Sequence, residues 1–324
     1  MNRPQKIKLA FTPTPVQEIK FEERKFLVKR DDMSGIELSG NKVRKLEYLL
    51  YQAKKEKAKY IFTCGGDQSN HARATAIAAA GLGMKTRLYL WGKEKPGSDG
   101  NLFLDKLSGS EIFFVNKHNY DFVNEIMQEE SEVLSGKGKK VFVIPEGGST
   151  TLGIWGYISF IEELKKQIDL KNIEGILIAA GTGGTAAGIL SGLALYHLNL
   201  KVFAVNVLYP AEIIRKKILQ LAEGVNLDYK LKIKIVPGQL EIMDGYSEEG
   251  YKKISVNKLE LINKFFKETG ILLDPAYTGK AFYAYHENFI QKNKRAEVLF
   301  LHTGGLYGVF GKRKEYLSSV YKTR

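Results

Sequence analysis

Cysteine is almost missing from this chain: its 324 residues include one, Cys64. A single cysteine excludes an internal disulfide and any metal site built from several thiolates. Long apolar runs are missing too, since no stretch approaches the roughly 18 uninterrupted apolar residues that a membrane helix needs. No such run follows the basic start Met1–Lys6, as a signal peptide would require. We therefore expect a cytoplasmic protein with no metal centre and no membrane partner.

Acidic residues are outnumbered, because 36 Asp and Glu stand against 49 Lys and Arg, giving a net charge of +13. Such a surplus would suit a nucleic-acid partner if the basic residues were concentrated on one face. They are instead scattered among glutamates, as in Lys54-Lys55-Glu56-Lys57, and no basic arm or aromatic-basic RNA motif is present. We interpret the surplus as a solvated surface and expect no nucleic-acid partner.

Strand-like apolar runs alternate with helical stretches, a pattern typical of an α/β protein with parallel sheets. Strands are expected at 60–63, 86–91, 111–115, 141–144, 176–179, 201–205 and 298–301, and two of the helices at 72–80 and 151–168. Glycine turns follow four of these strands, at 65–66, 147–148, 181–184 and 304–305. Ligands of open α/β sheets sit beyond the carboxyl ends of strands, so these turns can converge on one cleft. No linker divides the chain, which favours two lobes that share chain segments.

The turn Gly181-Thr182-Gly183-Gly184-Thr185 lies between a strand and a helix. It offers backbone N–H groups, two hydroxyls and a helix N-terminus to an anion, so it predicts a phosphate site. A tight strand-to-helix turn is the plain alternative. A dinucleotide-binding fingerprint is a third interpretation, but it requires an acidic residue about 20 positions later to bind the ribose. Residues 205–207 contain none, and the lysine of a P-loop is missing, so a single phosphate monoester suits the turn better.

A helix with an apolar face is expected from Val43, Leu46, Leu49 and Leu50. Lys42 precedes this face, next to basic and polar residues that could simply face solvent. A lysine that forms a Schiff base must point into a cleft with a lowered pKa, and nothing local in the sequence indicates that. Taken alone, the segment is best interpreted as a basic helix start.

A second turn, from Cys64 to His71, also joins a strand to a helix. It places Ser69 and Asn70 where side chains and backbone amides meet a bound anion, although helix capping is an equally good interpretation. His71 is the only nearby base, or else a side chain at the helix start. Because no base to activate Cys64 is evident, we expect this cysteine to be a packed small residue.

Six segments, in chain order, resemble the fold-type II enzymes that depend on pyridoxal 5'-phosphate (PLP), and specifically the 1-aminocyclopropane-1-carboxylate deaminase/D-cysteine desulfhydrase family. They are Leu38–Glu47, Gly65–His71, Pro145–Ser149, Gly181–Thr185, Asp274–Lys280 and His302–Gly305. One such motif would be weak evidence, whereas six in register over nearly the whole chain are strong evidence. The resemblance implies a tryptophan synthase β-like α/β fold of two domains, each an open, twisted, mostly parallel sheet flanked by helices. It implies a large PLP-binding domain of residues 1–45 and 153–324, a small domain of residues 46–152, a cofactor between them, and a homodimer.

The resemblance also implies roles for single residues. Lys42 corresponds to the Schiff-base lysine, and Ser69 and Tyr277 join it as catalytic residues for a small amino-acid substrate. Further cofactor contacts are implied for Asn70, Thr182, Gly183, Gly184, Thr185 and Thr278, and substrate contacts for Ser69, Asn70, His71, Tyr251, Tyr277 and Thr303.

The family divides at the residue after the active-site tyrosine, where the deaminases carry glutamate and this chain has Thr278. Glutamate there keeps the pyridine nitrogen of the cofactor protonated, which makes the ring a strong electron sink. Opening a cyclopropane needs that sink, whereas expelling a β-thiolate needs it less. Thr303 stands where the deaminases have leucine, and a polar residue there suits a β-substituent that bears a heteroatom.

The resemblance therefore implies α,β-elimination of D-cysteine to pyruvate, ammonia and hydrogen sulfide. Three alternatives stay open: deamination of the cyclopropane acid, a related lyase acting on L-cysteine, serine or a larger substrate, and a PLP-binding protein without catalytic activity.

Overall fold

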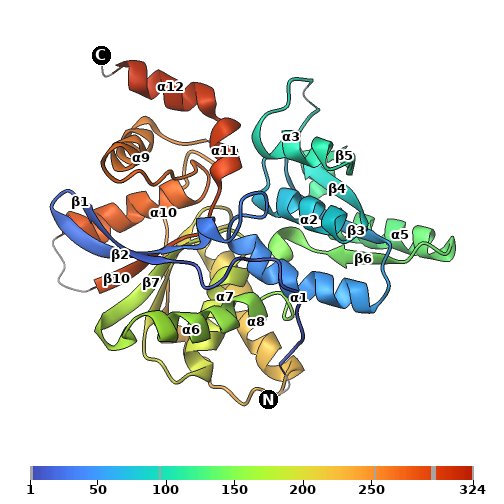
Figure 1. Cartoon of the computed structure of the whole chain (residues 1–324), viewed down its shortest axis with the longest axis horizontal. Helices are drawn as coiled ribbons and strands as arrows, with labels where there is room; N and C mark the ends of the chain where they lie inside the picture. Colours follow the sequence, from blue (N-terminus) through green and yellow to red (C-terminus); the bar gives the residue numbers. More distant parts are fainter. Residues whose placement is uncertain (1–2, 95, 252, 293–296, 323–324) are drawn as a thin grey trace.

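Two open sheets form the framework of the computed structural model, which describes residues 3–94, 96–251, 253–292 and 297–322 (Figure 1). The larger sheet consists, in spatial order, of β1 (Val16–Phe21), β2 (Arg24–Arg30), β10 (Glu297–His302), β7 (Ile173–Ala180), β8 (Lys201–Asn206) and β9 (Leu240–Met243). The smaller sheet consists of β5 (Glu111–Val115), β4 (Lys85–Trp91), β3 (Tyr60–Gly66) and β6 (Val141–Ile144). Neighbouring strands are parallel in both sheets, apart from the antiparallel β1–β2 hairpin at one edge.

Helices cover both faces of each sheet (Figure 1). They are α1 (Asn41–Lys55), α2 (Asn70–Gly81), α3 (Gly100–Leu107), α4 (Lys117–Tyr120), α5 (Val123–Gly136), α6 (Trp155–Gln167), α7 (Gly184–Leu195), α8 (Ala211–Asp228), α9 (Val256–Thr269), α10 (Thr278–Tyr285), α11 (Leu306–Phe310) and α12 (Arg313–Lys322). Short turns of other helix types are η1 (Asp31–Met33), η2 (Glu146–Gly148), η3 (Leu170–Asn172), η4 (Pro237–Gln239) and η5 (His286–Ile290).

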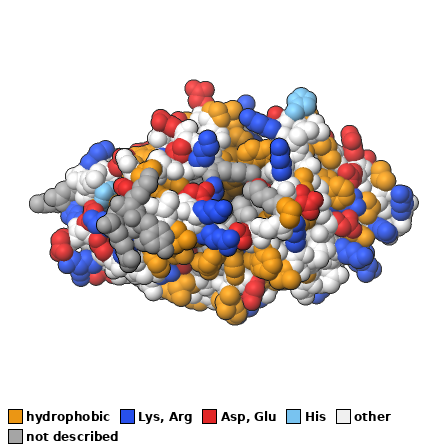
Figure 2. Space-filling view, turned by 90° about the horizontal axis from the view of Figure 1, so that it is seen from above, with side chains coloured by type: hydrophobic (Ala, Val, Ile, Leu, Met, Phe, Trp, Pro, Cys, Tyr) orange, Lys and Arg blue, Asp and Glu red, His pale blue; other side chains and the backbone are white. Residues whose placement is uncertain are grey.

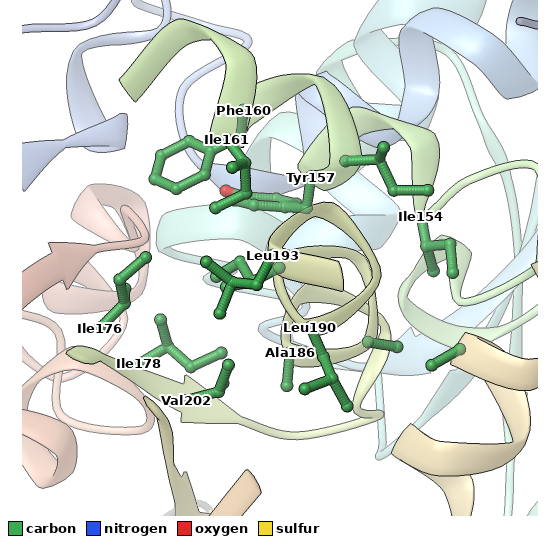
Figure 3. Close-up of a cluster of buried hydrophobic side chains, with 14 of the residues drawn as sticks. Ile154, Tyr157, Phe160, Ile161, Ile176, Ile178, Ala186, Leu190, Leu193 and Val202 are labelled. Carbon is green, nitrogen blue, oxygen red and sulfur yellow. The ribbon is translucent and has the colours of Figure 1, made fainter. Parts of the chain in front are cut away.

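Strand β7 is buried on both faces, near the centre of the larger sheet. Ile176 and Ile178 point to the face covered by α6, α7 and α8, and Figure 3 shows them on the side of α7. Leu177 and Ala179 alternate to the opposite face, where α9 and α10 pack. A strand covered on both faces requires such a continuous apolar run. Each fully buried Leu or Ile side chain contributes roughly 1.5–3 kcal/mol to folding.

The α/β fold predicted from the sequence is confirmed, and each of the seven expected strands is present. The sequence does not predict β1, β2 or β9. The β1–β2 hairpin turns on Glu22 and Glu23, both at positive φ (48° and 61°), where glycine or asparagine is the usual signal. Gly65 and Gly66 also differ from expectation, because they form the end of β3 instead of following it.

Helix α1 joins the two lobes. The smaller sheet uses only strands between residues 60 and 144, and the larger sheet uses strands before and after them. The side chain of Tyr48 packs into the core of the larger lobe, and those of Leu46 and Leu50 pack into the core of the smaller lobe. The predicted domain border after residue 45 falls inside α1 (Figure 1). The residue limits of the two domains stay a prediction.

Charged side chains of both signs are interspersed over the face drawn in Figure 2. Exposed charged side chains also pair locally elsewhere on the surface, as Lys166 does with Glu162 at 3.2 Å. This mixture is what the solvated-surface interpretation of the basic surplus requires. Within the described residues, no helix has both the length and the apolar character needed to cross a membrane.

Candidate active site

The turns that follow β3, β6, β7 and β10 converge on one place, as the sequence predicts. One narrow pocket is lined by Asn41, Lys42, Lys45, Asn70, residues 179–186, Tyr277 and Thr303. An adjoining pocket shares Lys42, Gly181, Thr182 and Tyr277 with it and adds Gly66, Ser69, His71, Glu146, Gly147, Leu208 and Tyr251. We refer to the two pockets together as the cleft. Every predicted site residue lines the cleft except Thr278.

The turn before α7 has the shape of an anion cup. Gly183 begins the helix at a positive φ of 84°, a conformation that favours glycine. A Cβ on Gly184 would lie 2.4 Å from Ser149 Oγ and 2.6 Å from Lys45 Nζ, so a larger residue there would displace these two polar groups from the cup. The N–H groups at the start of α7 point away from the helix, and the helix dipole favours an anion beside them. The cup thus combines backbone donors, hydroxyls and a lysine, which fits a phosphate group.

Hydroxyl and amide side chains brace this cup. Thr182 Oγ1 lies 2.7 Å from Ser149 Oγ, and the Asn41 amide donates to Thr185 Oγ1 at 3.0 Å. Asn41 belongs to the first turn of α1, next to Lys42, so the bond fixes the lysine-bearing helix against the phosphate turn.

Lys42 projects from the first turn of α1 into the cleft. Desolvation lowers the pKa of its amine to about 8, although the Glu146 carboxylate raises it in part. A lowered pKa leaves a useful fraction of neutral amine near physiological pH, which both Schiff-base formation and proton abstraction need. The local interpretation of a basic helix start that faces solvent is therefore wrong for this segment.

The neighbours of Lys42 are buried as well. Arg44 is 4% exposed and Lys45 is 1% exposed. The Lys45 ammonium donates to the Gly147 carbonyl at 3.1 Å and to Ser149 Oγ at 3.3 Å, beside the cup. Burial holds the pKa of Lys45 well below its usual range, and the charge of Lys42 adds to the effect. The sequence alone does not indicate a role for Lys45, because a buried lysine and a surface lysine look alike in a basic run.

The turn after β3 also supplies polar groups to the cleft. Ser69 caps α2 by accepting from the Ala72 N–H at 3.2 Å, so the capping interpretation is correct, and Ser69 lines the cleft too. The Asn70 side-chain oxygen accepts from the Asn101 amide at 3.0 Å. That bond leaves the NH₂ group of Asn70 free to donate a hydrogen bond, as expected of a residue that contacts the phenolic oxygen of PLP.

His71 is a neutral side chain with one free acceptor. The Thr63 hydroxyl donates to the Ile144 carbonyl at 2.7 Å, so it accepts from His71 Nε2, which lies 2.9 Å away. The other ring nitrogen, Nδ1, is buried without a partner among the described residues. Burial and the charges of Lys42 and Lys45 hold the pKa of His71 well below its usual value.

Two tyrosines, Tyr251 and Tyr277, also line the cleft. The hydroxyls of Tyr251 and Tyr277 lie 2.7 Å apart, with their rings edge to face at 5.6 Å. Burial holds the pKa of Tyr277 well above its usual value, so its hydroxyl stays a proton donor. The loop that carries Tyr251 is tied to α10, because the Lys280 ammonium donates to the Gly250 carbonyl at 2.8 Å.

The two threonines that bear on substrate choice lie in different surroundings. Thr303 lines the cleft, and its carbonyl accepts from the Asn41 N–H at 3.0 Å. Thr278 is fully buried at the start of α10, where its hydroxyl donates to Asp274 at 2.6 Å. A contact between Thr278 and the cofactor ring stays a prediction.

Comparison with known proteins shows which family this chain belongs to. A family model described as "Pyridoxal-phosphate dependent enzyme" matches residues 7–304. A protein of Thermotoga maritima named "Putative 1-aminocyclopropane-1-carboxylate deaminase" is 40% identical over 314 residues, which cover 95% of this chain and 99% of that protein. A protein of Arabidopsis thaliana named "Bifunctional D-cysteine desulfhydrase/1-aminocyclopropane-1-carboxylate deaminase, mitochondrial" is 37% identical over 327 residues, covering 94% and 79% of the two chains.

Solved structures agree with these relatives. A crystal structure titled as that of an "ACC deaminase homologue" superposes with a TM-score of 0.90 at 34% identity, covering 98% of this chain and 97% of that chain. A hydrogen sulfide-producing enzyme of Fusobacterium nucleatum superposes with a TM-score of 0.61 at 18% identity, covering 91% and 96%, which shows the fold alone. PLP is the cofactor of this family, and the cleft offers its phosphate a cup and its aldehyde a lysine. The chain is a PLP-dependent enzyme of the lyase type, and it belongs to the family of the 1-aminocyclopropane-1-carboxylate deaminases and D-cysteine desulfhydrases.

Proposed function

We propose that this lyase converts D-cysteine and one water into pyruvate, ammonia and hydrogen sulfide, acting in the cytoplasm as a homodimer. The turn after Tyr277 carries the proposal. Thr278 has no carboxyl group that could carry a charge. The Asp274 carboxylate accepts four hydrogen bonds of 2.6–3.0 Å from this turn. They come from the Thr278 hydroxyl and from the backbone N–H groups of Ala276, Tyr277 and Thr278. Both carboxylate oxygens of Asp274 are thus committed to the turn. Neither residue offers a free carboxylate to a pyridine nitrogen, which suits the expulsion of a thiolate better than ring opening.

The described side chains divide the work of such an elimination. Bound PLP supplies the electron sink that a carbanion at Cα needs. The Lys42 amine takes the Cα proton, because a pKa of about 8 makes it a base near neutral pH. Tyr277 gives a proton to the departing sulfur and is held in place by Tyr251. Ser69, together with the N-terminus of α2, binds the substrate carboxylate.

Opening of the cyclopropane ring is the second candidate, because the names of the Thermotoga and Arabidopsis relatives both include that deaminase activity. Ring opening expels a carbon leaving group and needs a more strongly stabilised carbanion. The committed Asp274 carboxylate and the neutral Thr278 therefore favour the desulfhydrase.

Product analysis separates the candidates. The purified holoenzyme is incubated with D-cysteine, L-cysteine, D-serine or 1-aminocyclopropane-1-carboxylate. We expect equal amounts of pyruvate and sulfide from D-cysteine, with a kcat/KM about 100-fold or more above that for the cyclopropane acid. Efficient formation of 2-oxobutyrate from the cyclopropane acid alone would overturn the proposal, and a preference for L-cysteine or serine would assign a different lyase reaction.

Replacement of Lys45 by methionine should weaken PLP binding without destabilising the protein lacking cofactor. A charge-assisted hydrogen bond to the phosphate is worth about 1.5–3 kcal/mol, so the dissociation constant of PLP should rise about 10- to 150-fold. Burial lowers the pKa of Lys45, which means that folding disfavours the charged form of this lysine. Removal of the charge should therefore not lower the stability of the cofactor-free protein. Fluorescence titration with PLP and thermal melting check the two expectations.

Lys280→Met is the matched control for Lys45. Burial also lowers the pKa of Lys280, to about 8, but this lysine holds the Tyr251 loop and does not line the phosphate cup. Equal PLP affinities for Lys45→Met and the unsubstituted enzyme would show that the cup does not use Lys45.

A further inference from the structure

A carboxylate with no part in the elimination lies at the mouth of the cleft. Glu146, in η2 after strand β6, lines the cleft beside Lys42, and it also lines an outer cavity of about 750 Å³. We call this outer cavity the vestibule. The Tyr120 hydroxyl donates to Glu146 Oε1 at 2.9 Å, and the Tyr209 hydroxyl donates to Oε2 at 3.2 Å. Tyr120 belongs to the lobe of the smaller sheet and Tyr209 to that of the larger, so Glu146 is held from both sides where cleft and vestibule meet.

The Glu146 carboxylate is hydrogen-bonded at both oxygens. Each oxygen accepts one hydrogen bond from a phenol, which fixes the orientation of the carboxylate at this position. Burial raises the pKa of both Tyr120 and Tyr209, so the two phenols keep the protons that they donate. Two further acceptor positions on the carboxylate are not filled by these phenols.

The described residues provide Glu146 with no ion pair within 4.0 Å. Lys42, whose pKa Glu146 raises, is a nearby cation, but the proposed reaction uses that amine. Lys117 and Lys217 line the vestibule, and the Lys217 ammonium lies 5.0 Å from the centre of the Tyr209 ring. Glu146 therefore presents a negative charge with spare acceptor capacity toward the space next to the reacting lysine.

The vestibule is larger than cysteine needs. A cysteine side chain has one heavy atom beyond Cβ, whereas a cavity of about 750 Å³ is of the size that holds drug-sized ligands. Because Glu146 lines both spaces, a longer substrate side chain that leaves the cleft for the vestibule passes this carboxylate.

We propose that Glu146 binds a positively charged nitrogen on the substrate side chain, so that the enzyme also takes amino acids whose side chains end in an ammonium group. The proposal depends on the proposed function only in that an amino acid binds beside Lys42, whichever β-substituent is expelled. A charge-assisted hydrogen bond is roughly twice as strong as a neutral one. The same carboxylate repels a side-chain carboxylate, so side-chain charge sets the substrate class.

Binding of three amino acids of similar length tests this subsite. The PLP-loaded enzyme is titrated with 2,4-diaminobutyrate (cationic), homoserine (neutral) and aspartate (anionic), each as both enantiomers, and the change in the cofactor's visible spectrum gives the dissociation constants. We expect 2,4-diaminobutyrate to bind about tenfold or more tightly than homoserine and aspartate to bind most weakly. Glu146→Gln, which keeps an acceptor for a phenol, should bring 2,4-diaminobutyrate and homoserine within about threefold of each other.

Asp121→Asn serves as the control, because Asp121 lines the vestibule but not the cleft. The preference for the cation should survive in this variant. Equal binding of 2,4-diaminobutyrate and homoserine to the unsubstituted enzyme would overturn the proposal, as would a preference that persists in Glu146→Gln. Tightest binding of aspartate would assign the subsite to Lys117 and Lys217 instead. These ratios compare binding without turnover. The test of the Glu146 subsite is therefore independent of the D-cysteine assay, which tests the reaction.

Discussion

Replacement of Lys42 by alanine should remove both the catalytic activity and the visible absorption band of the bound cofactor. Lys42 lines both pockets of the cleft, and its pKa of about 8 suits it to attack an aldehyde and to act as a base. Loss of a general base costs about 10²–10⁴-fold in rate, and loss of the lysine's covalent role adds to it. We therefore expect kcat/KM to fall by at least about 10³-fold.

Lys45 and Lys280 provide the controls for this experiment. Both are buried lysines with lowered pKa values, but the Lys45 amine is committed to Gly147 and Ser149, and Lys280 lies outside the cleft. Lys280→Met, and Lys45→Met at saturating PLP, should keep the absorption band. A Lys42→Ala variant that retained the band would show that another amine carries the cofactor.

Replacement of Arg44 by methionine should cost the largest share of folding stability of any single change considered. The Arg44 guanidinium binds Asp31 through two nitrogens at 2.8 and 2.9 Å, and it binds Glu163 at 2.8 and 2.9 Å. Asp31 is fully buried, and Arg44 is 4% exposed. Removal of one partner leaves a buried carboxylate without its main counter-charge, which costs about 3–5 kcal/mol.

Urea denaturation measures this loss, with Lys25→Met as the control. Lys25 pairs with Glu18 at 2.9 Å, but both side chains are more than half exposed. We expect no measurable change in the free energy of unfolding for Lys25→Met, because solvent screens an exposed pair. A loss of less than about 1 kcal/mol for Arg44→Met would mean that the buried network relaxes or takes in water around Asp31.

A central strand such as β7 is readable from the sequence because burial on both faces leaves an apolar run, as at Ile176–Ala179. The β1–β2 hairpin is not readable in this way, since it lies at an edge, mixes charged with apolar residues, and turns on two glutamates instead of glycine. Ser69, Asn70 and Tyr277 are identified by resemblance, and the structure brings them together with Lys42 around one cleft.

The positions of Lys45 and Glu146 in the cleft cannot be predicted from the sequence. Both stand in segments that the resemblance includes, yet neither has a residue type or spacing that distinguishes a cleft residue from a surface one. Their burial and partners depend on how α1, η2 and the turn before α7 pack, which is a property of tertiary structure. The same packing turns Lys42 from one of several basic residues into a base enclosed in a cleft.

The attachment point of PLP shows directly whether Lys42 is the Schiff-base lysine. The holoenzyme is reduced with sodium borohydride, which makes the bond between cofactor and lysine permanent, then digested and analysed by mass spectrometry. We predict one modified peptide, with the phosphopyridoxyl group on Lys42. Modification of Lys45 or Lys280, or no modified lysine at all, would contradict it.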